Sequence, residues 1–214
     1  MAKLLTNTGI EEPRIILDVG ANRGDWTYEA YSEWPRAQIF AIEPSPLAHT
    51  ELCKRMEKID NVISRKLAIG AVCGEAVLFS NEPGSELSLL RQRRLEHFGI
   101  SLSLTEKVTL STLDDFVKVN GILEIDVLKI DVEGSKMEVL LGGEEVLRRV
   151  KVVQFEWGEA STGTQVHWVD FWYFFLEREM SMYRITPQGA KEVMRYHPRD
   201  EVMTWTNYLA VRKV

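Results

Sequence analysis

Two carboxylates stand two residues apart at the end of an apolar stretch, where they could accept a proton or bind a cation. The stretch covers residues 125–134, and its two acids are Asp131 and Glu133. Residues two apart in an extended chain point to the same side, so both carboxylates would face one site. A base beside a reacting hydroxyl can take its proton. Either acid could instead bind an amino group, or a divalent metal that orients two hydroxyls.

A second group of residues has the spacing of a nucleoside site. Residues 15–24 read IILDVGANRG, an apolar strand followed by a turn that contains Gly20 and Gly24. Glycine adopts positive φ and lets a ligand approach the backbone closely. A second apolar strand, residues 38–42, ends at Glu43, which is placed to accept hydrogen bonds from the two hydroxyls of a ribose. Two glycines alone could form only a tight turn, but an acid at this distance favours binding.

Asn22 narrows the choice of nucleoside. A nicotinamide site usually has the pattern G-x-G-x-x-G, with its middle glycine against a pyrophosphate, and Asn22 stands at that position. We therefore expect S-adenosylmethionine, an adenosine that carries a short amino acid on sulfur. Gly20, Asn22 and Gly24 are assigned to its methionine part and Glu43 to its ribose. The full set of predicted cofactor contacts is Asp18, Gly20, Asn22, Gly24, Glu43, Pro44, Ala68, Ile69 and Asp131. A nicotinamide-dependent oxidoreductase and a nucleotide-binding module without turnover are the alternatives.

A basic cluster is the candidate for binding the substrate. Arg91, Arg93, Arg94 and His97 lie together in a long region of weak periodicity. One interpretation is a solvated helix face. The other is a local positive patch that holds an anionic substrate group such as a phosphate or carboxylate. His97 and His167 are also fallback candidates for the base.

Composition limits the partners. The net charge of the 214-residue chain is -6, so no broad basic surface is available for a nucleic-acid backbone, and we expect a small-molecule substrate. Cys53 and Cys73 lack metal-ligand spacing and predict free thiols in a reducing cytoplasm. The most apolar run, residues 166–176, is too short to cross a bilayer.

The elements that must position these residues alternate between strand and helix. Strands at 15–19 and 38–42, with helices at 25–34 and 47–58, predict right-handed crossovers and a parallel sheet. After a third strand at 61–69, residues 69–79 predict a hairpin. Further expected elements are a short strand at 108–110, a helix from 112, a strand at 125–132, a helix at 135–147, a strand at 150–155, a helix at 167–176, short segments at 182–185 and 191–194, and a strand at 204–211.

We therefore expect an α/β fold with a doubly wound, mostly parallel sheet. Residues 1–14 form an arm, and residues 15–214 form a single domain. Within it, residues 70–107 form a hairpin and an insertion for substrate specificity. The last segment, 204–211, alternates without a preceding helix, which predicts a C-terminal antiparallel strand.

Four motifs occur in order between residues 15 and 158: LDVGANRG at 17–24, AIEPSP at 41–46, TLDDF at 112–116 and LKIDVEG at 128–134. With them the chain resembles the FkbM family of S-adenosylmethionine-dependent methyltransferases. The resemblance implies a seven-stranded, Rossmann-like class I methyltransferase fold and O-methylation of a hydroxyl in a sugar or secondary metabolite. That family commonly has an acid two positions after the last glycine. Lys136 stands there instead and reverses the local charge, which leaves the module without turnover as an alternative.

Overall fold

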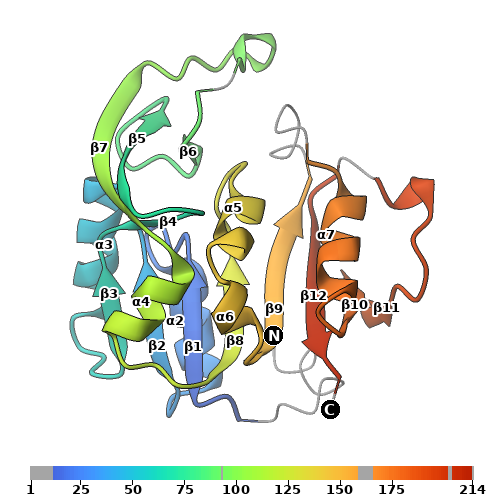
Figure 1. Cartoon of the computed structure of the whole chain (residues 1–214). Helices are drawn as coiled ribbons and strands as arrows, with labels where there is room; N and C mark the ends of the chain where they lie inside the picture. The colour runs from blue at the N-terminus through green and yellow to red at the C-terminus, as the bar shows by residue number, and fades with distance from the viewer. Residues whose placement is uncertain (1–11, 93, 159–165, 202–203, 214) are drawn as a thin grey trace.

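A large mixed sheet with helices on both faces forms the body of the protein in the computed structural model, which describes residues 12–92, 94–158, 166–201 and 204–213 (Figure 1). Its strands are β1 (Ile15–Val19), β2 (Gln38–Ile42), β3 (Val62–Arg65), β8 (Ile125–Ile130), β9 (Val150–Trp157), β10 (Met180–Thr186), β11 (Gly189–Glu192) and β12 (Thr206–Arg212). They lie in the order β11-β10-β12-β9-β8-β1-β2-β3.

The directions of these strands confirm the expected doubly wound sheet. β3, β2, β1, β8 and β9 run parallel to one another, and β12 pairs antiparallel with β9. β10 is antiparallel to β12, and β11 pairs with β10 as a hairpin. The sheet has one strand more than the seven expected because β11 adds to its edge.

The helices cover the two faces unequally. They are α2 (Asp25–Glu33), α3 (Pro46–Met56), α4 (Leu113–Val119), α5 (Lys136–Leu141), α6 (Glu144–Leu147) and α7 (Trp168–Leu176). Ile16 of β1 joins a core cluster with Ala30 of α2, whereas Leu17 joins the larger cluster that contains residues of α4 to α7. Alternate side chains of this buried strand thus pack into the cores on opposite faces of the sheet. Trp168, Phe171, Phe174 and Phe175 of α7 belong to this larger core, and Phe171 and Phe175 both stack on Phe155.

The single helix expected at 135–147 is wrong, because two glycines divide it. α5 ends at Leu141 and α6 begins at Glu144. A Cβ atom on Gly142 would lie 2.0 Å from the carbonyl oxygen of Gly70, so no larger residue fits there without a shift of backbone. This close approach brings the first loop of the second sheet against the helical layer.

A second, four-stranded sheet stands at the end of the main sheet where the parallel strands finish (Figure 1). Its strands are β4 (Ala68–Ile69), β5 (Gly74–Ser80), β6 (Ser88–Leu89) and β7 (Leu104–Ser111), in the order β4-β7-β5-β6. Three expectations are corrected here. The strand expected at 61–69 is divided between the two sheets. The hairpin expected at 69–79 does not form, because β4 and β5 both pair with β7. The short strand expected at 108–110 begins instead at Leu104.

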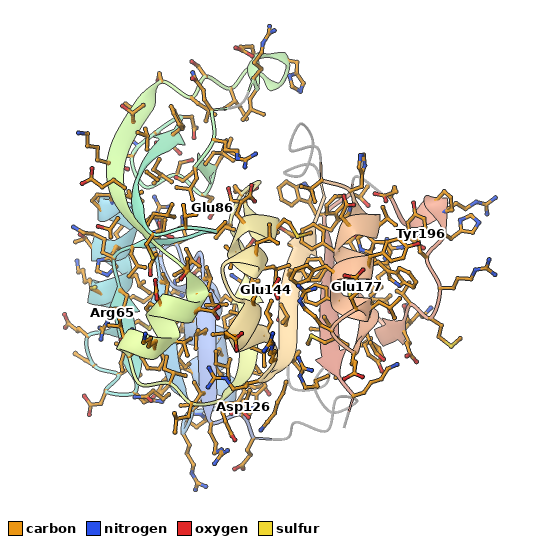
Figure 2. All side chains as sticks on the ribbon, viewed as in Figure 1. Arg65, Glu86, Asp126, Glu144, Glu177 and Tyr196 are labelled. Carbon is orange, nitrogen blue, oxygen red and sulfur yellow. The ribbon has the colours of Figure 1, made fainter. Side chains whose placement is uncertain are left out.

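Asp126 ties the beginning of β1 to β8 at the opposite end of the main sheet, far from Glu86 (Figure 2). One oxygen of its buried carboxylate accepts hydrogen bonds from the backbone N–H groups of Arg14 (2.7 Å) and Ile15 (3.0 Å), and the other accepts from Lys151 Nζ (2.5 Å). Burial alone would raise the pKa of Asp126, but these hydrogen bonds outweigh it and lower the pKa.

Replacing Asp126 by asparagine should lower the free energy of unfolding by about 1 to 3 kcal/mol at neutral pH, because a charged acceptor of three hydrogen bonds is lost. A carboxylate with a lowered pKa stabilises the fold above its ordinary value of 3.8, and this stabilisation disappears as the pH falls through the lowered value. Urea denaturation over a pH series measures both effects. Asp60→Asn, at an exposed position, is the control, and equal stability of the two variants would contradict the role of Asp126.

Candidate functional site

The turn between β1 and α2 is shaped by close contacts with neighbouring strands. Gly20 has a φ of 84°, and a Cβ atom there would lie 2.1 Å from the carbonyl oxygen of Asp131. Its N–H donates to the carbonyl of Ile42 at 3.0 Å. Asn22 has a φ of 46°, in the left-handed region that asparagine tolerates better than most residues. The turn is therefore packed between the ends of β2 and β8.

Glu43 lies at the end of β2 with its carboxylate already oriented. Oε2 accepts a hydrogen bond from the N–H of Asn22, and Oε1 accepts one from the N–H of Ser45, both at 2.8 Å. The side chain is almost fully buried. Burial raises the pKa of Glu43, and the nearby Asp18 adds to this, against the two backbone hydrogen bonds. Each oxygen retains a lone pair for a further donor.

An inner cavity opens beside Glu43 at the ends of β1, β2 and β8. Most of its walls are apolar, and its lining includes Val19, Gly20, Asn22, Ile42, Glu43, Pro44, Leu67, Ala68, Ile69, Leu78, Leu90, Asp131 and Glu133. Ser85, Glu86, Ser88 and Leu90, in and beside β6, also line it. Its volume is about 50 Å³, well below the roughly 300 Å³ or more of typical ligand sites.

A larger outer cavity of about 470 Å³ adjoins the inner one. The two share Gly20, Asn22, Glu86, Asp131 and Glu133. The charged side chains of the outer cavity are five carboxylates and one ammonium, namely Asp25, Glu86, Asp131, Glu133, Glu156 and Lys129. Trp26 and Trp205 supply aromatic surface. The outer cavity is therefore acidic, and it suits cationic or hydroxyl-bearing groups better than anions.

Lys129 is a buried cation at the base of the outer cavity. Its Nζ lies 3.2 Å from Oδ1 of Asp18 and 3.3 Å from Oδ2 of Asp131. It also lies 5.4 Å from the ring centre of Trp26, within cation–π range. Burial alone would lower the pKa of Lys129, but the two carboxylates outweigh it and raise the pKa. The ammonium thus stays charged and holds Asp131 in place.

The geometry at the strand ends can now be compared with known proteins. The family model described as "Methyltransferase FkbM domain" matches residues 18–185. The chain belongs to the FkbM methyltransferase family. A curated relative, 2-O-methyltransferase NoeI of Sinorhizobium fredii, is 28% identical over 160 residues, which cover 70% of this chain and 66% of the relative. Methyltransferase sdnD of Sordaria araneosa is 27% identical, again over 66% of its length. The chain spans just under two thirds of these relatives.

Solved structures show the same fold. Precorrin-6y C5,15-methyltransferase from Geobacter metallireducens superimposes with a TM-score of 0.52 at 12% identity, over 98% of this chain and 86% of that one. Aeropyrum pernix fibrillarin, solved with natively bound S-adenosyl-L-methionine, gives a TM-score of 0.50 at 13% identity, over 98% of this chain and 73% of that one. The expected Rossmann-like class I methyltransferase fold is confirmed.

Two predicted cofactor residues of this FkbM protein lie away from both cavities. The fully buried Asp18 accepts hydrogen bonds from Thr27 Oγ1 (2.6 Å) and Lys129 Nζ (3.2 Å), so it orients Lys129 and is absent from the lining of either cavity. Gly24 faces α3, where a Cβ atom would lie 2.6 Å from Leu52. It permits close helix packing. The other predicted contacts all line the inner cavity: Gly20, Asn22, Glu43, Pro44, Ala68, Ile69 and Asp131.

Arg91, Arg94 and His97 of the basic cluster lie outside the linings of the two cavities. Arg91 pairs with Glu138 of α5 at 2.7 Å, and Arg94 is almost fully exposed. Arg93 lies outside the described residues. The fallback base His167 begins α7, where its N–H donates to Asp170 at 2.7 Å, and it is likewise absent from both linings.

Lys129 and Glu156 were missed by the sequence analysis, although each had a signal. Lys129 interrupts an otherwise apolar strand, which indicates a buried partner for its charge. Glu156 follows Phe155 in β9 just as Asp131 follows Ile130 in β8, and Ile130 and Phe155 are paired. The rule that placed Asp131 at the carboxyl end of a central strand also places Glu156 there.

Two further findings concern metals and membranes. Across the described ranges, no three His, Cys, Asp or Glu side chains are arranged to hold a metal ion, so the metal role considered for Asp131 and Glu133 gains no support.

None of the helices in the described part of the chain has both the length and the apolar character needed to cross a bilayer.

Substituting methionine for Lys129 should destabilise the protein by about 3 to 5 kcal/mol, since Asp18 would remain buried without its cation. Chemical denaturation followed by tryptophan fluorescence tests this. The double variant Asp18→Asn/Lys129→Met should recover much of the loss, because neither side chain then carries a charge. Arg148→Met, which removes an exposed ion pair with Glu145, should change stability by less than about 1 kcal/mol. A Lys129→Met variant as stable as the wild type would contradict the buried pairing.

Proposed function

We propose that this FkbM family member is an S-adenosylmethionine-dependent O-methyltransferase that acts on a hydroxyl of a sugar or secondary metabolite. The observation that carries the proposal is the junction of the two cavities. The inner cavity is apolar and lies beside the oriented carboxylate of Glu43, and it adjoins the outer cavity, which is acidic and partly lined by tryptophan. The relative named 2-O-methyltransferase supports transfer to oxygen.

The residues of the inner cavity fit an adenosine. Apolar side chains such as Ile42, Leu67 and Ile69 suit the faces of an adenine ring. The free lone pairs of Glu43 suit the two ribose hydroxyls. Hydrogen bonds from these hydroxyls would offset part of the free-energy cost of burying the carboxylate charge. In the outer cavity, the carboxylate of Asp131 is placed for the ammonium group of the methionine part, with Gly20 and Asn22 beside it.

The acidic outer cavity also bears on the nicotinamide alternative. A pyrophosphate carries two negative charges and would approach five carboxylates. Moreover, the Asn22 N–H, which could otherwise bind phosphate, already donates to Glu43. The site thus favours a cationic cofactor over a dinucleotide.

When bound, S-adenosylmethionine supplies an electrophilic methyl group whose departure leaves an uncharged thioether. The protein's own contribution is to hold the acceptor in the outer cavity, in line with the junction, and to exclude water. Asp131 and Glu133 border that junction, and their assignment as catalytic bases stays a prediction. Ser85, Glu86, Ser88 and Leu90 line the inner cavity, and Glu86 and Leu87 line the outer one. This supports a role in substrate recognition for the insertion predicted at 70–107.

Titration calorimetry with S-adenosylhomocysteine, and with NAD in parallel, tests the cofactor. We expect micromolar binding of the first and none of the second. Catalysis is tested by following S-adenosylhomocysteine formation with a panel of methyl glycosides. Cofactor binding without turnover on any acceptor would favour the non-catalytic module, whereas folded protein that ignores S-adenosylhomocysteine would refute the cofactor assignment.

Changing Glu43 to glutamine should weaken S-adenosylhomocysteine binding by about tenfold or more, because hydrogen bonds to a charged acceptor become neutral ones. In the wild type, affinity should fall as the pH is lowered through the pKa of Glu43, which lies above its ordinary value of 4.5, since the protonated acid accepts hydroxyl hydrogen bonds poorly. The Glu43→Gln profile should lack this step. Glu57→Gln, on the exposed end of α3, is the control, and a step that persists without Glu43 would disprove its assignment.

A further inference from the structure

We propose that Glu156 is the general base that removes the proton from the acceptor hydroxyl, a role that rests on the proposed methyl transfer. Glu156 lines the outer cavity at the carboxyl end of β9. The base is thereby assigned to a strand different from the one that carries Asp131 and Glu133.

The register of the sheet places Glu156 beside Asp131. Lys129 pairs with Gln154 and Ile130 with Phe155 across the parallel strands β8 and β9. Side chains alternate along a strand, so Gln154 and Glu156 share the face of Lys129, and Asp131 continues that face beyond β8. Both carboxylates therefore reach the same cavity from neighbouring strands.

Ion pairing separates the roles of the two acids. Asp131 is held 3.3 Å from the ammonium of Lys129, so its carboxylate is already engaged in an ion pair. The side chain of Glu156 takes part in none of the hydrogen bonds or ion pairs observed among the described side chains. It is therefore available to a ligand. Glu133 is less accessible, because its Oε2 is buried and its backbone bridges to Leu89 of β6.

The charges around Glu156 favour basicity. Burial raises its pKa, and the carboxylates of Asp131 and Glu133 raise it further, while Lys136 and Lys129 act in the opposite direction. Asp25 and Glu86 are the other acids of the cavity, from the beginning of α2 and the segment before β6. Of the two neighbouring carboxylates, Asp131 is thus engaged by Lys129, whereas Glu156 is placed to exchange a proton.

The proposed step is balanced. As the O–H bond of the acceptor breaks, its proton moves to an oxygen of Glu156 and the hydroxyl oxygen forms a bond to the methyl carbon. The C–S bond breaks with its electron pair remaining on sulfur. Because the cavity already holds five carboxylates, the acceptor class that fits is an uncharged or cationic alcohol, and phosphorylated or carboxylated acceptors are disfavoured.

Proton release on cofactor binding tests Glu156 without any knowledge of the acceptor. S-adenosylmethionine and S-adenosylhomocysteine are titrated by calorimetry in two buffers of different ionisation enthalpy, over a pH series that brackets the raised pKa. The positive sulfonium should expel a proton from Glu156, so the wild type should release more protons with S-adenosylmethionine than with S-adenosylhomocysteine. Glu156→Gln should bind both ligands and lose this difference.

Asp25→Asn, which removes another acid of the outer cavity, is the comparison variant and should retain the difference in proton release. Asp131→Asn and Glu133→Gln should move the difference to lower pH without abolishing it, because both carboxylates raise the pKa of Glu156. In turnover with methyl glycosides, Glu156→Gln should lower kcat about 10²- to 10⁴-fold with little change in the KM for S-adenosylmethionine. Loss of the difference in Asp131→Asn or Glu133→Gln, with its persistence in Glu156→Gln, would overturn the assignment of Glu156. Failure of the wild type to bind either ligand would instead refute the proposed function itself.

Discussion

The buried ammonium of Lys129 is the interaction on which the geometry of the site depends. It joins three elements, because Asp18 belongs to β1, Asp131 follows β8 and Trp26 begins α2. A lone charge in this position would be strongly destabilising, so the three contacts must form together. Thr27 completes the arrangement by donating to the second oxygen of Asp18. A charge network that stabilises the fold therefore also sets the position of an acid in the cavity.

The strand ends account for most of what the sequence could predict. Apolar runs located the parallel strands, and the chemistry at their ends located Glu43, Asp131 and the turn at Gly20. Asp18 and Gly24 belong to the same motif as Gly20, yet they act on Lys129 and on α3. A motif indicates that its residues contribute to one site. It does not distinguish the residues that contact a ligand from those that stabilise the turn.

The errors arose where partners are far apart in sequence. The glycines at 70 and 74 indicated a local hairpin, whereas β4 and β5 each pair with β7, whose paired residues lie 24 to 42 positions further along the chain. Gly142 interrupts the predicted helix because it meets Gly70, a contact without a local signal. Arg91 belonged to a basic cluster in sequence, but Glu138 on α5 neutralises it. Long-range pairing decided all three outcomes.

The second sheet links the two parts of the site. Glu86 lines both cavities, and Leu89 bridges to the backbone of Glu133. Ser85, Glu86, Ser88 and Leu90 line the inner cavity, and Glu86 and Leu87 line the outer one. One short segment between β5 and β7 therefore contributes to the walls of both cavities, so a change in its sequence would alter the shapes of the two together.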